Sequence, residues 1–167
     1  MSFGSGAATA LGSFYLDWAY TSQNTAITVI THTDKDMDTA VLWMGANNIS
    51  STQQVKDDIA AAFNHFKALA KRVLVMTVLP NDSYLPTTAA GISLANVNAW
   101  ILSEFPDNSV DALGYLKSKG NGSTQDNTDV ANNITPLSLR VDSIHLTNAG
   151  YQHIADLSYA FFTARGW

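Results

Sequence analysis

The stretch that decides the fold is Arg72-Val-Leu-Val-Met-Thr-Val-Leu79, which is almost continuously apolar and stops at Pro80. It is too short for most helices and carries no alternating polar face, so it predicts a strand that is covered on both sides, as in a parallel sheet. A second short apolar run, residues 39–44, ends at Gly45 and has the same character. These two runs predict adjacent buried strands.

Helical patterns lie on both sides of these runs. Apolar residues recur at helical spacing over 53–70 and 91–105, and a closing amphipathic helix is expected over 147–164. Strand and helix segments that alternate in this way predict an α/β fold with a mainly parallel sheet. We further expect a helix over 7–20, short strands over 26–30 and 109–113, and a long polar loop over 117–133.

The composition is that of one ordinary domain. The chain has 167 residues, of which 46% are hydrophobic, so we expect a single domain over 1–167 with a sizeable core. A formal net charge of -5, with only 9 Lys and Arg, argues against nucleic acid or an anionic membrane as the main partner. No apolar run is long enough for a membrane span, and residues 1–6 do not resemble an export signal. The compartment stays undetermined, since the absence of Cys does not fix it.

Two short segments carry groups suited to acyl-transfer chemistry. In Asp142-Ser-Ile-His145 the spacing allows the carboxylate and the imidazole to converge within a single turn. The carboxylate can then fix the ring tautomer and stabilise the imidazolium, as a general base requires. Gly45-Ala-Asn-Asn48 follows the 39–44 run directly, which places the Asn47 amide at the carboxyl end of a strand, where α/β sheets bind ligands. Together, the two segments suggest His145 as a general base, Asp142 as the acid that orients it and Asn47 as an oxyanion donor.

These motifs resemble the sequence blocks of the SGNH (GDSL-like) hydrolases, which are esterases and lipases. The family's Gly-x-Asn-Asp block is similar to residues 45–48, although Asn48 stands where the family has Asp. Its Asp-x-x-His block, with a later Gly and a last helix, is similar to residues 142–150, and a Ser-Gly turn is similar to Ser5-Gly6. The resemblance covers essentially the whole chain and implies a flavodoxin-like three-layer α/β/α fold. The Gly-Asp-Ser block, whose serine is the family's nucleophile, does not occur.

The resemblance also implies a mechanism. A serine would attack an ester carbonyl while His145 takes its proton and Asp142 holds His145. The Asn47 side-chain amide and the Gly6 backbone N–H would bind the oxyanion, without a cofactor or metal. Ser5 is a weak candidate for a replacement nucleophile, since no strand precedes it to hold it in a strained turn. The family's habits suggest small acyl esters, such as acetyl esters of carbohydrates, as substrates.

If the resemblance holds, the first strand, the first helix and the serine would lie upstream of Met1, so this chain alone is expected to be nearly inert. The 39–44 strand would then become a sheet edge that exposes unpaired backbone groups. We expect residues 26–30, a second copy or a separate polypeptide with the missing serine to cover this edge. The reading we favour is instead that the chain is an incomplete part of a longer gene product, whose export signal would lie in the absent part.

Two other functional classes remain open. One is a binding module that keeps the pocket for an acylated carbohydrate and has lost the chemistry. The other is an interaction domain in which Asp142 and His145 are structural. The remaining histidines, His32, His65 and His153, are expected on the surface or on helix faces, and Asp34, Asp36 and Asp38 in a solvated loop rather than a Ca²⁺ site. The tryptophans Trp18, Trp43, Trp100 and Trp167 are expected to be core or helix-packing residues rather than a sugar platform.

Overall fold

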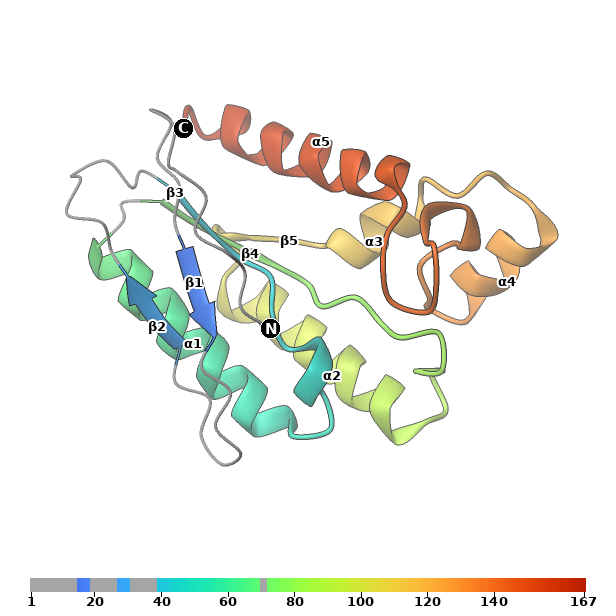
Figure 1. The fold of residues 1–167 in the computed structure, drawn as a ribbon, viewed down its shortest axis with the longest axis horizontal. Helices are drawn as coiled ribbons and strands as arrows, with labels where there is room; N and C mark the ends of the chain where they lie inside the picture. Colours follow the sequence, from blue (N-terminus) through green and yellow to red (C-terminus); the bar gives the residue numbers. More distant parts are fainter. Residues whose placement is uncertain (1–14, 19–26, 31–38, 70–71) are drawn as a thin grey trace. The chain divides into compact units, whose positions relative to one another are not determined.

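The computed structural model describes residues 15–18, 27–30, 39–69 and 72–167 (Figure 1). The chain divides into two compact units, residues 1–38 and residues 39–167. We describe each unit by itself. The prediction of a single domain over 1–167 stays a prediction.

The first unit contains an antiparallel pair of strands, β1 (Tyr15–Trp18) and β2 (Ile27–Ile30). The strand predicted over 26–30 is therefore confirmed. The helix predicted over 7–20 is wrong at residues 15–18, and its other residues lie outside the described part of the chain. The aromatic residues in the sequence of β1 and the β-branched residues in that of β2 are types that favour strands.

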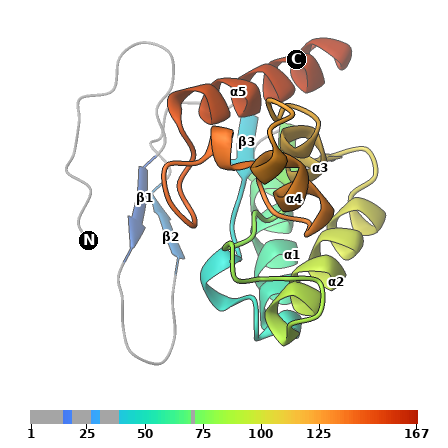
Figure 2. The same ribbon diagram turned by 90° about the vertical axis from the view of Figure 1, so that its right-hand side faces the viewer.

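The second unit contains a three-stranded parallel sheet in the order β3-β4-β5. Its strands are β3 (Thr39–Leu42), β4 (Arg72–Met76) and β5 (Ser109–Val110). The helices are α1 (Thr52–Leu69), α2 (Ala89–Glu104), α3 (Ala112–Lys117), α4 (Thr124–Ala131) and α5 (Asn148–Ala164), with short 3-10 helices η1 (Ala46–Asn48) and η2 (Leu137–Leu139). Helices α1 and α2 cover one face of the sheet, and α3 and α5 cover the other (Figure 2). The predicted α/β class, with a parallel sheet flanked by helices, is confirmed.

The central strand β4 is buried on both faces. Leu74 and Met76 belong to a cluster of buried residues that includes Leu116 of α3 and Ile154 of α5. Because side chains alternate along a strand, Val73 and Val75 face the side covered by α1 and α2. This two-sided burial explains the continuously apolar sequence of the strand.

Two predicted boundaries are corrected by capping residues. The strand predicted over 109–113 ends at Val110, because the Asp111 side chain accepts a hydrogen bond of 2.9 Å from the Gly114 amide and begins α3. The loop predicted over 117–133 contains α4, capped by Ser123.

Burial of Asp126 on this helix disfavours its charge. Hydrogen bonds from Ser138 and from a backbone amide nevertheless outweigh burial and lower its pKa.

Within the part of the chain that the structure describes, β3 forms an edge of the parallel sheet, and β2 is paired with β1. Whether residues 26–30, a second copy or another polypeptide covers this edge stays a prediction. None of the described helices is long and apolar enough to cross a bilayer.

Candidate active site

The site lies where the chain leaves β3 and β4. After β3, Gly45 has φ 109°, a conformation that L side chains rarely adopt. A Cβ at this position would also lie 2.7 Å from Cγ1 of Val55 on α1. Glycine therefore allows the sharp turn into η1, and Ala46 at the start of η1 lines the pocket described below.

The exit of β4 is fixed by the side chain of Asn98 on α2. Its Oδ1 accepts a hydrogen bond of 2.7 Å from the Val78 amide, and its Nδ2 donates one of 2.9 Å to the Val78 carbonyl. Beyond Met76, where β4 ends, the Asn98 carboxamide thus makes the backbone hydrogen bonds that a neighbouring strand would otherwise make. This contact holds Val78 and Leu79 beside the pocket.

Asp142 and His145 form the hydrogen-bonded pair that their spacing predicts. His145 Nδ1 lies 2.8 Å from Oδ2 of Asp142. Oδ1 of the same carboxylate accepts hydrogen bonds from the amides of His145, at 2.7 Å, and Ile144, at 2.8 Å. The hydrogen bonds from the His145 amide and ring, and then from the Ile144 amide, lower the pKa of Asp142 to about 2.

An ionised carboxylate at Nδ1 favours the ring tautomer that carries its proton there. The ring's Nε2 then has a free lone pair, and it makes no hydrogen bond with the described residues. Both side chains are accessible, with 65% of His145 and 52% of Asp142 exposed. The imidazole is therefore held in the orientation that a general base needs.

The turn that carries this pair is anchored by Arg140, which sequence reasoning missed. Its side chain is only 9% exposed and its Nη2 lies 3.0 Å from Oδ2 of Asp129, which is 5% exposed. Its Nη1 lies 3.2 Å from Oδ2 of Asp82 and donates a hydrogen bond of 3.3 Å to the Asp142 carbonyl. One guanidinium thus joins α4, the segment after β4 and the Asp142 turn. The only signal in the sequence is an isolated arginine in an apolar stretch two residues before Asp142.

Backbone hydrogen bonds complete the turn. The Val141 amide donates to the His145 carbonyl at 2.8 Å, and the Asp82 amide donates to the Ser143 carbonyl at 3.2 Å. Beyond the turn, Thr147 caps α5 by accepting a hydrogen bond of 3.1 Å from the Gly150 amide. A Cβ on Gly150 would lie 2.4 Å from the Leu139 carbonyl, so glycine allows α5 to approach η2 closely.

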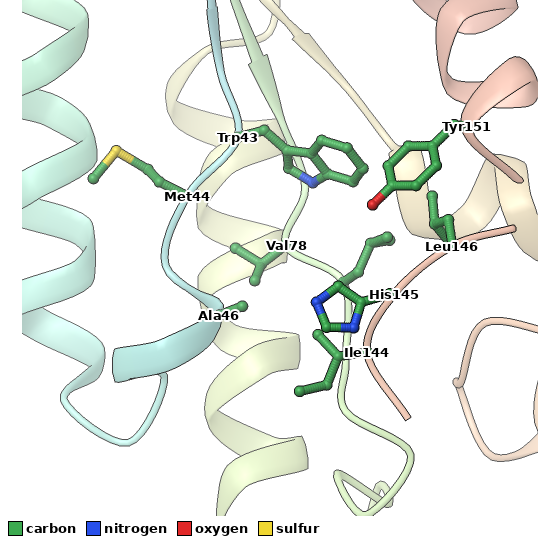
Figure 3. Close-up of a pocket in the computed structure, with 9 residues that line it drawn as sticks. Trp43, Met44, Ala46, Val78, Ile144, His145, Leu146 and Tyr151 are labelled. Carbon is green, nitrogen blue, oxygen red and sulfur yellow. The ribbon is translucent and has the colours of Figure 1, made fainter. Parts of the chain in front are cut away.

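A surface pocket of about 180 Å³ opens beside the His145 ring. Figure 3 shows the Trp43 indole, the Tyr151 ring and the His145 imidazole turned toward one another, whereas Met44 points away. The residues that line it come from the segments after β3 and β4, from the Asp142 turn and from α5: Trp43, Met44, Ala46, Val78, Leu79, Ile144, His145, Leu146 and Tyr151. The expectation that Trp43 is a core residue is wrong, since 37% of it is exposed and it forms a wall of this pocket.

Among the predicted site residues, the structure brings His145 and the Gly45–Asn48 turn to one pocket. Asn47 is exposed, next to the pocket-lining Ala46, and its side chain makes no hydrogen bond with the described residues. Its role as an oxyanion donor stays a prediction. Ser5 and Gly6 lie outside the described residues, so their predicted roles also stay predictions.

The other candidates do not gather into a site in the described part of the chain. His65 is exposed on α1, and His153 is partly buried on α5, where its ring forms a T-shaped pair with the Tyr115 ring. Trp100 and Trp167 are partly buried and pack against phenylalanine rings, as expected. Within the described residues, no three His, Asp or Glu side chains are grouped so that they could hold a metal ion. His32, Trp18 and the acidic run over 34–38 have side chains outside the described part.

Comparison with known proteins shows a partial similarity to a phage protein. No family model and no solved structure matches this chain. The chain is similar to the tail spike protein of Salmonella phage epsilon15, with 31% identity over 144 residues. The match covers 78% of this chain but only 13% of that protein. The chain is thus similar to a small part of a phage tail spike protein.

Proposed function

We propose that this chain is an ester hydrolase module of the SGNH type. One observation carries the proposal: the Asp142 carboxylate holds Nδ1 of His145 at 2.8 Å, and the His145 ring lines an apolar pocket. A carboxylate-oriented imidazole at a ligand-sized pocket is the arrangement of a general base in acyl transfer. The parallel sheet supports it, because the pocket is built from the segments that follow β3 and β4.

In the proposed reaction, Nε2 of His145 takes the proton of a serine hydroxyl as its oxygen attacks the ester carbonyl carbon. The imidazolium is stabilised by the ionised Asp142 and then gives the proton to the leaving alcohol. The Asn47 amide and the Gly6 N–H would donate to the negatively charged oxygen of the tetrahedral intermediate. Water then repeats these steps to release the acid from the serine.

The described lining of the pocket does not supply a serine nucleophile. No residue that lines the pocket is Ser, Thr or Cys. We propose that a serine comes from outside the described part of the chain or from another polypeptide, and Ser5 is the weak candidate within this chain. The similarity to part of a phage tail spike protein supports a module that works inside a longer protein. An acylated carbohydrate is the substrate that we propose, from the resemblance to the hydrolase family.

The lack of Ser, Thr and Cys in the described pocket lining also favours a second function. A pocket that keeps its base but has no Ser, Thr or Cys side chain in its described lining suits a binding module for an acylated carbohydrate. In that case His145 would contribute a hydrogen bond to the ligand rather than accept a proton from a nucleophile.

The hydrolysis of 4-nitrophenyl acetate separates the two functions. The chain is assayed alone and with an added peptide that contains a Gly-Asp-Ser strand, together with the variants His145→Ala and His65→Ala. The hydrolase proposal predicts turnover in at least one of these conditions, which His145→Ala abolishes and which His65→Ala, an exposed histidine on α1, leaves unchanged. Absence of turnover in both conditions, with binding of an acetylated sugar, would establish the binding module instead.

A further inference from the structure

The pocket beside His145 has the size and lining of an apolar binding site. Its walls include Trp43, Val78, Leu79, Ile144 and Leu146, and its volume is about 180 Å³. An apolar cavity of about 150 Å³ in another protein holds one benzene molecule. The pocket beside His145 can therefore hold a group of about six carbon atoms, and an acetyl group would leave most of it empty.

The Trp43 indole, which forms one wall of the pocket, is held by a hydrogen bond within the protein. Nε1 of Trp43 donates a hydrogen bond of 3.1 Å to the Thr77 carbonyl, so the indole's polar atom is satisfied inside the protein. Thr77 is itself fully buried. Its hydroxyl donates a hydrogen bond of 3.2 Å to Oδ1 of Asp111 and accepts one of 3.1 Å from the Leu113 amide. The indole thus offers carbon atoms to a ligand, in a position that the fold determines.

Polar side-chain atoms that remain for a ligand lie at His145 and Tyr151. Nδ1 of His145 is occupied by Asp142, which leaves Nε2 for the reacting end of the ligand. The Tyr151 side chain is half exposed, and its hydroxyl makes no hydrogen bond with the described residues. Figure 3 places these two rings beside the indole. A ligand with one polar end and one apolar end matches this distribution.

We propose that the pocket binds the acyl group of the substrate, and that it prefers an acyl group of about four to six carbon atoms over acetyl. The assignment to the acyl side of an ester rests on the proposed hydrolase function, whereas the preference for an apolar group of this size rests on the pocket alone. The inference thus changes the substrate class from acetyl esters to esters of short apolar acids.

Binding of neutral amides tests the size preference without any need for turnover. Acetamide, butyramide, hexanamide and octanamide have the shape of the acyl part of an ester, and NMR shifts of the chain's backbone amides report their binding. Each CH₂ group that enters the pocket should raise the affinity about fourfold, so butyramide should bind about fifteenfold more tightly than acetamide. Octanamide should gain nothing over hexanamide, because the pocket is then full. Affinity that does not depend on chain length would overturn the inference.

A matched pair of variants ties the binding to this pocket. Ile144 lines the pocket and Ile92 lies on α2 outside its lining, and both are 51% exposed. Ile144→Ala should weaken butyramide binding about fourfold, which corresponds to one lost CH₂ contact. Ile92→Ala should leave it unchanged. Equal effects of the two substitutions would place the binding elsewhere and overturn the inference.

These results separate the inference from the proposed function. Chain-length-dependent amide binding without hydrolysis of 4-nitrophenyl butyrate would keep the pocket assignment and refute the hydrolase. Equal hydrolysis of 4-nitrophenyl acetate and butyrate, with no dependence of amide binding on length, would keep the hydrolase and refute the acyl pocket.

Discussion

Replacing Arg140 with methionine should destabilise the second unit strongly, because it leaves the Asp129 carboxylate buried without its partner. Removal of one member of a buried ion pair costs about 3–5 kcal/mol. The lower end applies here, since Asp129 keeps a hydrogen bond of 2.8 Å from Gln125. The pair with Asp82, whose side chain is 44% exposed, adds little. Loss of the 2.9 Å hydrogen bond from Arg140 to the Thr135 carbonyl adds about 1 kcal/mol, so we expect about 4 kcal/mol in total.

Urea unfolding followed by circular dichroism measures this loss, with Arg165→Met as the matched control. Arg165 is an exposed arginine that donates one hydrogen bond, to the Asp107 carbonyl, and stacks on Phe161. Its replacement should cost about 1 kcal/mol. Adding Asp129→Asn to Arg140→Met should recover about half of the loss, because the unpaired buried charge is then removed. Similar losses in the two arginine variants, or no recovery in the double variant, would refute the reasoning.

The same substitution has a local consequence at the site. Arg140→Met removes the Nη1 donor to the Asp142 carbonyl and so loosens the turn that aligns Asp142 with His145. In folded protein, ¹⁵N NMR of the His145 ring should then show a smaller share of the Nδ1-protonated tautomer than in the unsubstituted chain. His65 and His153 serve as internal references, and their signals should not change.

Three further substitutions test other parts of the account. The pKa of Asp142 is lowered to about 2, so its ionised form stabilises the fold at any pH above the ordinary value near 4. This stabilisation is lost as the pH falls toward 2. Acid unfolding curves should therefore depend less on pH in Asp142→Asn than in the unsubstituted chain. Gly45→Ala should lower the free energy of unfolding more than Gly122→Ala, because both have positive φ but only a Cβ at Gly45 meets another atom; equal losses in urea titrations would contradict this. In any sample that hydrolyses 4-nitrophenyl acetate, Asn47→Ala should lower kcat about 10²–10³-fold with an unchanged circular dichroism spectrum, and an unchanged kcat would remove Asn47 from the oxyanion site.

The sequence predicts the sheet well because burial leaves a direct pattern in it. The continuous apolar run over 72–79 contains β4, which ends at Met76, and the shorter run over 39–44 contains β3, which ends at Leu42. Helices α1, α2 and α5 follow from helical spacing. Helix α4 escapes prediction because it is polar and depends on the Ser123 cap and on the buried Asp126. The Ser123 cap is a local contact, but the hydrogen bonds between Asp126 and Ser138 form only in the folded chain, and a local pattern does not predict them.

The candidate site also contains one part that the sequence predicts and other parts that it does not. The Asp142–His145 pair is predictable because both partners lie in one turn, and local spacing is enough to bring them together. The pocket is not, because Trp43 and Tyr151 meet only after segments distant in sequence have folded. Arg140 is also missed, since its partners Asp82 and Asp129 become its neighbours only in the folded chain.

Labelling with a fluorophosphonate tests most directly whether His145 activates a serine. In that reaction the serine oxygen bonds to phosphorus, fluoride leaves, and His145 takes the hydroxyl proton. Mass spectrometry of the chain, alone and with the Gly-Asp-Ser peptide, should find one modified serine, and the modification should disappear in His145→Ala and persist in His65→Ala. A chain that is never modified under either condition, or one that is modified equally in His145→Ala, would contradict the account.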